Sequence, residues 1–175
     1  MLRVRNKLWL VSDTHFGHHN IIKFQQRPAT HEIIMLSEWI WRVGEHDQIL
    51  HLGDVVVGRG GNPKRWLTVI NRLPGEKFLI KGNHDKMRDS FYEAAGFTIV
   101  PEFVYKTVAF THRPLTEDMY DDDGNEWTVN VHGHTHSNEY KPEHDGILLP
   151  GKVYKNVCVE HTELAPVQLG NVHPF

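Results

Sequence analysis

Five short apolar segments of this chain each run into side chains that can bind a metal ion. In chain order the segments lead into Asp13 and His15, Gly53-Asp54, Gly82-Asn83-His84-Asp85, Thr111-His112, and Gly133-His134 with His136. Ligands of an α/β sheet bind beyond the carboxyl ends of its strands. The pattern therefore constrains the chain to a fold in which these five strand ends meet at one edge.

The first half of the chain alternates predicted strands and helices. Apolar residues recur at helical spacing over residues 31–43, and Asn62-Pro63 is a typical helix start before a Pro74-Gly75 stop. Three strand–helix repeats favour parallel βαβ units. The strands of this half are predicted at Leu8–Val11, Gln48–Leu52 and Lys77–Ile80, and a short third helix at Met87–Ala95.

The second half is richer in predicted strands than in helices. The whole chain, with 175 residues, fits a single domain, residues 1–175, with a sizeable core. Residues 116–126, which contain Asp121-Asp122-Asp123, are predicted to form an exposed acidic loop. The predicted strands are Phe103–Thr111, Trp127–Val131, Gly146–Leu149, Val153–Val159 and Pro166–Leu169.

Composition and charge exclude several classes of function. The formal charge of −3, from 19 basic and 22 acidic side chains, gives no broad basic surface for duplex DNA or an anionic membrane. No apolar run approaches the roughly 18 residues that span a bilayer, and the run before Ser12 is too short for a signal-peptide core. Cys158 is the only cysteine and cannot form an internal disulfide. We expect a soluble cytoplasmic protein without a membrane partner.

The residue types at the strand ends indicate a particular metal chemistry. Carboxylate, imidazole and carboxamide ligands suit Mn, Fe, Co, Ni or Zn, and the absence of a thiolate excludes a structural cysteine-type zinc site. Seven ligands are too many for one tetrahedral ion but suit two ions that share one carboxylate. His134 and His136 alternate along what is predicted as an extended segment, so both should face one side. The seven are Asp13, His15, Asp54, Asn83, His112, His134 and His136.

In this order, the five motifs resemble those of the calcineurin-like metallophosphoesterases. The resemblance covers roughly the whole chain, including the tail from Asn156 to Val167. It is strongest for the small, compact bacterial and phage phosphoesterases, because the stretch from Ser12 to His18 with Asn20-Ile21-Ile22 is close to one such subgroup. The resemblance implies two packed mixed β-sheets flanked by helices, a four-layer sandwich of the α/β (α+β) class.

The resemblance also implies a role for each motif residue. Asp13, His15 and His136 would hold one divalent ion and Asn83, His112 and His134 a second, with Asp54 bridging both. Manganese is the expected metal, and Fe, Ni, Co and Zn remain alternatives. A bridging hydroxide would attack phosphorus, His84 would act as the general acid, and Asp85 would orient His84.

Other polar residues are candidates for substrate contact. His18 belongs to the subgroup motif, Asn83 adjoins His84, and Arg113 follows His112, so these three are expected to bind substrate. Arg27, Arg59, Lys64 and Arg65 are further candidates for a phosphate contact. His132 and Cys158 are expected to be packing residues. The tryptophans of the predicted helices are expected to lie in the core or at an interface.

The expected activity is that of a phosphodiesterase on a small phosphate ester or nucleotide. A phosphomonoesterase or a nuclease of the same fold is an alternative, although the charge does not indicate nucleic acid. A non-catalytic metal-binding interaction module is a rival from another class, and the intact set of motifs argues against it. A mononuclear metalloprotein would be distinguished by metal stoichiometry. The sequence does not indicate the oligomeric state.

Overall fold

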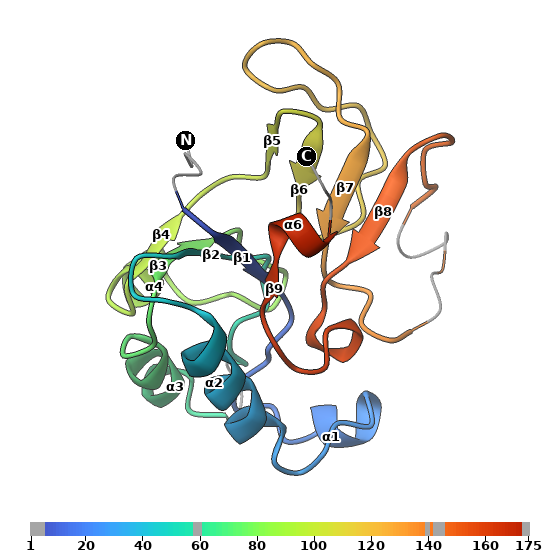
Figure 1. Cartoon of the computed structure of the whole chain (residues 1–175). Helices are drawn as coiled ribbons and strands as arrows, with labels where there is room; N and C mark the ends of the chain where they lie inside the picture. The colour runs from blue at the N-terminus through green and yellow to red at the C-terminus, as the bar shows by residue number, and fades with distance from the viewer. Residues whose placement is uncertain (1–5, 58–60, 139–140, 142–145, 173–175) are drawn as a thin grey trace.

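The chain forms two mixed β-sheets that pack against each other, with helices on the outer face of the first (Figure 1). The structure is a computed structural model, and it describes residues 6–57, 61–138, 141 and 146–172. This arrangement confirms the predicted fold class of two packed mixed sheets with helices.

The first sheet has the strand order β4-β3-β2-β1-β9. Its first four strands pair in parallel, so their carboxyl ends lie at the same edge. The last strand pairs antiparallel with β1 and makes the sheet mixed. The strands are β1 (Leu8–Val11), β2 (Gln48–His51), β3 (Glu76–Leu79), β4 (Phe97–Ile99) and β9 (Val167–Gln168).

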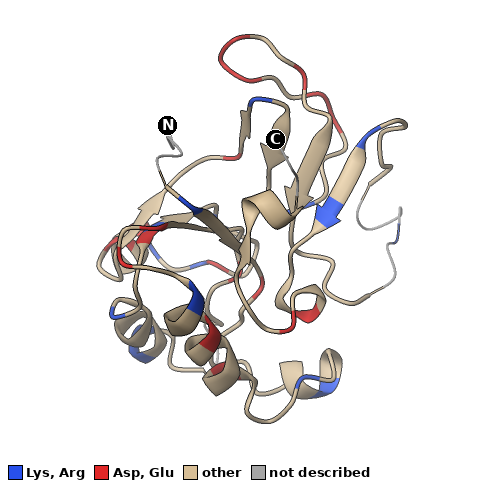
Figure 2. Ribbon diagram, viewed as in Figure 1, with Lys and Arg blue, Asp and Glu red and all other residues tan. Residues whose placement is uncertain are grey.

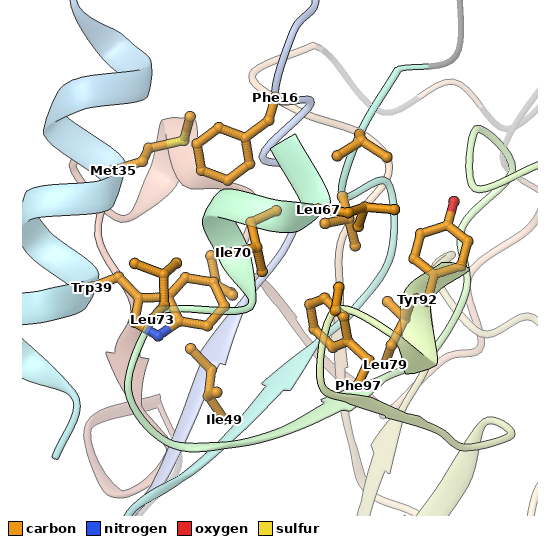
Figure 3. Close-up of a cluster of buried hydrophobic side chains, with 14 of the residues drawn as sticks. Phe16, Met35, Trp39, Ile49, Leu67, Ile70, Leu73, Leu79, Tyr92 and Phe97 are labelled. Carbon is orange, nitrogen blue, oxygen red and sulfur yellow. The ribbon is translucent and has the colours of Figure 1, made fainter. Parts of the chain in front are cut away.

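Three helices cover the outer face of the first sheet and enclose a buried apolar cluster (Figure 3). They are α2 (His31–Arg42), α3 (Pro63–Ile70) and α4 (Asp89–Glu93). Trp39 of α2, Ile70 of α3 and Tyr92 of α4 each point into this cluster, where they meet Ile49 and Leu79 from the sheet. Packing of these apolar faces, more than helix propensity, holds such short helices in place.

The second sheet has the strand order β5-β6-β7-β8. Its first pair is antiparallel, and the following two pairs are parallel. The carboxyl ends of β6 and β7 therefore lie at one edge, as the site motifs require. The strands are β5 (Phe103–Tyr105), β6 (Val108–Phe110), β7 (Val129–His132) and β8 (Val153–Asn156).

A second apolar cluster fills the space between the sheets. Leu50 and Phe78 from the first sheet meet Phe110 and Val131 from the second. Neighbouring residues of β2 and β3 point to opposite faces, so Ile49 and Leu79 join the helix-side cluster while Leu50 and Phe78 join this one. Burial on both faces explains why these strands are continuous apolar runs in the sequence.

Among the described residues, loop segments cover part of the far face of the second sheet. There Leu115 and Trp127 pack against Val104 and Ala109, with Tyr154 beside them. The remaining short elements are α1 (Ile21–Phe24), the 3₁₀ helix η1 (Val159–His161) and α6 (Leu169–Val172).

Several element boundaries differ from the sequence prediction. The segment predicted as one strand over Phe103–Thr111 is a hairpin, because the chain reverses near Lys106, whose φ is +55°. No strand forms at Gly146–Leu149, and the strand predicted over Val153–Val159 ends at Asn156. Strand β4 and helix α1 were not predicted, since each is too short to show a clear apolar period.

Charged residues are spread over several elements, and most residues of the acidic loop at 116–126 are exposed, as predicted (Figure 2). Asp121 in this loop accepts hydrogen bonds from Asp123 and Asn125, so its carboxylate stabilises the loop's own turn. Among the described residues, no helix is long and apolar enough to cross a membrane.

The start of α3 provides a test of the local structure. Asn62 has a left-handed backbone (φ +47°), and its side chain accepts a hydrogen bond from the Arg65 N–H at 3.3 Å. We expect Asn62→Ala to lower the free energy of unfolding by about 1–2 kcal/mol, because it loses the cap and strains the backbone. Asn62→Gly tolerates the conformation and should cost only a few tenths of a kcal/mol. Urea unfolding of the metal-free protein measures both, and equal losses would contradict this explanation.

Candidate metal centre

The seven predicted ligands lie together where β1, β2, β3, β6 and β7 end. Six of them fall into three overlapping groups, and within each group the ligand atoms lie within 4.8 Å of one another. The group that contains Asp13 and His136 also includes the thiol of Cys158. Asn83 is outside these groups and lies beside His112. We call Asp13, His15 and His136 the His15 group, and Asn83, His112 and His134 the His112 group. Asp54 lies between the two groups.

In the His15 group, two ring nitrogens and one carboxylate oxygen converge. The Nε2 atoms of His15 and His136 lie 3.2 Å apart. They lie 3.7 Å and 3.6 Å from Oδ1 of Asp13. That oxygen is buried and has no hydrogen-bond partner among the described residues. A buried acceptor of this kind costs free energy unless it is paired, so the group fits a cation at this position.

The His112 group offers a second set of nitrogen and oxygen ligands. Nε2 of His112 lies 3.0 Å from Oδ1 of Asn83. The His112 and His134 rings are 5.0 Å apart between centroids, and their ligand atoms lie close to that of Asp54. An amide oxygen, two imidazoles and a carboxylate form a donor set that suits a borderline divalent ion.

Asp54 joins the two groups through one atom. Its Oδ2 lies 3.7 Å from Nε2 of His15 and 3.6 Å from Nε2 of His112. Its Oδ1 accepts the backbone N–H of His84 at 2.7 Å, which fixes the rotation of the carboxylate. A single oxygen between two imidazole sets is the geometry required of a bridging ligand.

Two histidines have the tautomer that a metal ligand requires. Nδ1 of His112 lies 2.7 Å from the carbonyl oxygen of Leu52, and Nδ1 of His136 lies 3.0 Å from Oε1 of Glu160. Because these oxygens only accept, each Nδ1 carries a proton, and Nε2 is left to face the centre. Histidines that bind metals commonly donate their second ring nitrogen in this way.

Three donors hold the other oxygen of Asp13. Its Oδ2 accepts from Ser12 Oγ at 2.5 Å, from the His134 N–H at 2.8 Å and from Cys158 Sγ at 3.2 Å. Burial would raise the pKa of Asp13, but the His15 imidazole beside it and the charges of the surrounding histidines hold that pKa well below its usual range. The carboxylate is therefore ionised and oriented with Oδ1 toward the centre.

The backbone at the ligands is strained. Left-handed conformations of non-glycine residues cost free energy and persist only where surrounding contacts enforce them. The sequence predicted an extended segment at His134 and His136. The structure differs, because each of these residues has a positive φ and the chain turns there. The strained ligands are Asp13 (φ +57°), His15 (+48°), Asp54 (+59°), His134 (+68°) and His136 (+51°).

Glycines next to the ligands are required by close approach. A Cβ on Gly133 would lie 1.9 Å from Ser12 Oγ and 2.3 Å from Asp13 Oδ2. A Cβ on Gly82 would lie 2.2 Å from Asp54 Oδ1. No side chain fits at these positions unless the carboxylates move.

The resemblance implied that Asp85 orients the His84 ring, but the structure shows a different role. Its two oxygens accept from the backbone N–H groups of Asp54, Val55 and Gly82 and from the Tyr92 hydroxyl. These bonds tie the loop after β3 to the loop after β2, so the carboxylate positions the backbone around Asp54. Burial raises the pKa of Asp85, although the backbone hydrogen bonds oppose this shift.

His84 and His18 lie at the solvent side of the centre. Their rings lie 5.4 Å and 5.8 Å from the His15 ring, measured between centroids. Burial lowers the pKa of each, and the charge of His15 acts in the same direction. His84 is exposed and His18 is half-buried, so both can meet a molecule that approaches the centre.

The basic candidates separate into different roles. Arg113 is exposed and close enough to His134 for its charge to act with burial in lowering the pKa of that histidine to about 4. Arg27 is buried and paired with Glu160, so it is not free to hold a phosphate. Lys64 lies over the Phe91 ring, and Arg65 is exposed on α3. Arg59 lies outside the described residues.

Three residues near the centre were missed or misjudged from the sequence. Cys158 is buried, as predicted for a packing residue, but the sequence did not indicate that its thiol donates to Asp13. Glu160 accepts from Nδ1 of His136, and Glu102 accepts from the backbone N–H of His112. No motif marks these positions, and only the folded chain brings them to the ligands. His132, as expected, is buried beside Tyr154 and away from the ligand sets.

The fold and the candidate donor set fit the class of metal-dependent phosphoesterases. The sequence model of the calcineurin-like phosphoesterase superfamily domain matches residues 7–164. The chain therefore belongs to the calcineurin-like phosphoesterase superfamily, whose members are hydrolases that use divalent metal ions.

Relatives of the chain are small proteins from archaea and phages. An uncharacterised protein of Methanocaldococcus jannaschii, MJ1445, is 30% identical over 167 residues, covering 93% of this chain and 87% of that protein. The Gene 66 protein of Mycobacterium phage L5 is 27% identical over 159 residues, covering 74% of this chain and 77% of that protein.

Solved structures show the same fold. The protein of unknown function AQ665 from Aquifex aeolicus has a TM-score of 0.70 at 23% identity, over 95% of this chain and 97% of that one. The Pseudomonas putida nuclease MPE has a TM-score of 0.50 at 24% identity, over 74% of this chain and 61% of that one.

Gly133 provides a test of how tightly the centre is built. We expect Gly133→Ala to lower the free energy of unfolding by about 1–3 kcal/mol, because the new Cβ displaces Ser12 and Asp13. It should also weaken Mn²⁺ binding. Gly170→Ala is the matched control, since a Cβ there meets nothing within 4 Å. Urea unfolding and calorimetric Mn²⁺ titration measure both effects, and a Gly133→Ala protein equal to the control would disprove the close contact.

Proposed function

We propose that this protein is a dinuclear-metal phosphodiesterase that cleaves small phosphate esters or nucleotides. The observation that carries the proposal is the position of Asp54 Oδ2, 3.7 Å from His15 Nε2 and 3.6 Å from His112 Nε2. One carboxylate oxygen between two complete ligand groups suits two ions, with Asp13, His15 and His136 on one and Asn83, His112 and His134 on the other. Manganese is the proposed metal.

When bound, two such ions would activate water and neutralise charge on the phosphate oxygens. The chain's own residues would then position the ester and handle the leaving group. His84 is exposed beside His15, where its ring can donate a proton to the departing oxygen. His18, Asn83 and Arg113 would contact the phosphate or its substituent, and Asp85 would keep the loop that carries His84 against Asp54.

A diester is favoured over a monoester because, among the described residues, few of the candidate cationic side chains lie close to the centre and are free of other pairs. Arg27 is paired with Glu160. Among the described arginines predicted from the sequence to contact phosphate, Arg113 is both exposed and close to a predicted ligand, His134. A monoester carries one more negative charge than a diester and would need more cationic contacts. A nuclease is the second candidate, since the structurally similar Pseudomonas putida protein is a nuclease and its reaction is also diester cleavage.

The activity is tested with a chromogenic phosphodiester and its monoester counterpart. Metal-stripped protein should be inactive, and Mn²⁺ should restore turnover of the diester more than that of the monoester. Asp54→Asn should abolish this turnover and reduce the bound Mn²⁺, because the amide carries no charge and its single oxygen cannot both accept the His84 N–H and face His15 and His112. Two bound ions without turnover of either ester would contradict the proposed activity, and single-stranded DNA and RNA would be the next substrates.

The role of His84 is tested separately. We expect His84→Ala to bind Mn²⁺ like the parent and to lose about 10²–10⁴-fold in kcat on diesters with poor leaving groups. The loss should be small on a nitrophenyl ester, whose leaving group needs no proton. His46→Ala is the control, because His46 is an exposed histidine before β2, at the opposite end of that strand. An equal loss on both kinds of ester would contradict the role as general acid.

A further inference from the structure

A buried ion pair lies directly behind the His15 group. Glu160, in η1, and Arg27, after α1, have side chains only 6% and 1% exposed. Glu160 Oε1 accepts from Arg27 Nε at 2.8 Å and from Nη2 at 2.6 Å. Residues 133 positions apart in the chain are thus joined beneath the centre.

The carboxylate of this pair also holds a proposed ligand. Glu160 Oε1 accepts the Nδ1 proton of His136 at 3.0 Å. This bond sets the tautomer and the rotation of the ring, and it directs Nε2 toward His15 and Asp13. A carboxylate behind a histidine raises the basicity of the nitrogen that faces the metal.

The guanidinium of the pair holds the backbone of the segment that carries Asp13 and His15. Arg27 Nη2 donates to the carbonyl oxygen of Asp13 at 2.6 Å, and Nη1 donates to that of Thr14 at 2.8 Å. These carbonyls lie within the strained turn, in which Asp13 and His15 have positive φ. The planar fork of arginine can satisfy both carbonyls and Glu160 at once, which a lysine cannot do.

The cost of this arrangement indicates a role beyond packing. The second oxygen of Glu160 is buried without a hydrogen-bond partner among the described residues. Burying a charged pair with an unsatisfied oxygen is expensive, and an apolar pair of the same volume would often be more stable. Arg27 donates two hydrogen bonds to Glu160 and two to the backbone around Asp13. Glu160 in turn accepts from His136, so the pair contacts the His15 group through both of its members.

We propose that Glu160 and Arg27 are positioning residues that set the metal affinity of the His15 group and leave that of the His112 group unchanged. The inference rests on the proposed two-metal site but not on the identity of the substrate. The pair acts on the first group from two directions: through the His136 ring, and through the backbone of Asp13 and Thr14.

The test is a calorimetric titration of metal-stripped protein with Mn²⁺, without substrate. In Glu160→Gln, we expect the affinity of one of the two ions to fall by about 10–100-fold and that of the other to stay within error. Glu163→Gln is the matched control, since Glu163 is an exposed carboxylate three residues further along. Equal weakening of both ions, or no weakening, would overturn the inference.

A second variant and a second readout guard against a folding defect. Arg27→Lys keeps the positive charge and loses the fork, so it should also weaken one ion while the metal-free protein still unfolds cooperatively. In the Zn²⁺-loaded protein, imidazole ¹⁵N spectra should show His136 protonated at Nδ1, and this signal should change in Glu160→Gln but not in Glu163→Gln. An unchanged His136 signal would overturn the role of Glu160. Parent protein that binds two ions but cleaves no ester would refute the proposed function alone.

Discussion

Two buried carboxylates, Asp13 and Asp54, impose the main constraint on this structure. Both lie at the carboxyl edge of the first sheet, where burial penalises their charge. The structure compensates with hydrogen bonds that occupy one oxygen of each and with imidazoles that surround the other. The loops after β1, β2, β3 and β7 are all shaped by this requirement.

The compensation has a local cost in backbone strain. Five of the seven proposed ligands adopt left-handed conformations, and Gly82 and Gly133 allow contacts that a Cβ would block. Such strain persists because the surrounding network enforces it. Asp85 binds two loops together through three backbone N–H groups, and Arg27 binds two carbonyls of the first turn. The buried polar side chains around this centre therefore form hydrogen bonds with the backbone of the loops as well as with one another.

The sequence predicted the repeating part of the fold well because both faces of its strands are buried. Leu8–Val11 was assigned as found, Gln48–Leu52 to within one residue, and the start of α3 was read from Asn62 and Pro63. The prediction was wrong where local signals are weak. The β5–β6 hairpin was read as one strand, since its reversal at Lys106 lacks a glycine or proline. Gly146–Leu149 is apolar yet forms no strand.

The sequence by itself determined which residues gather at the centre, because each follows an apolar strand and parallel strands end at one edge. It also determined the superfamily. Tertiary structure alone decided how the gathered side chains are held. Asp85 follows His84 in the chain, yet its oxygens face the backbone of another loop. Glu160 and Cys158 reach the ligands because the chain before η1 pairs with Ser12, directly after β1. Contacts between distant segments depend on how the sheets and loops pack, and no local pattern in the sequence encodes that packing.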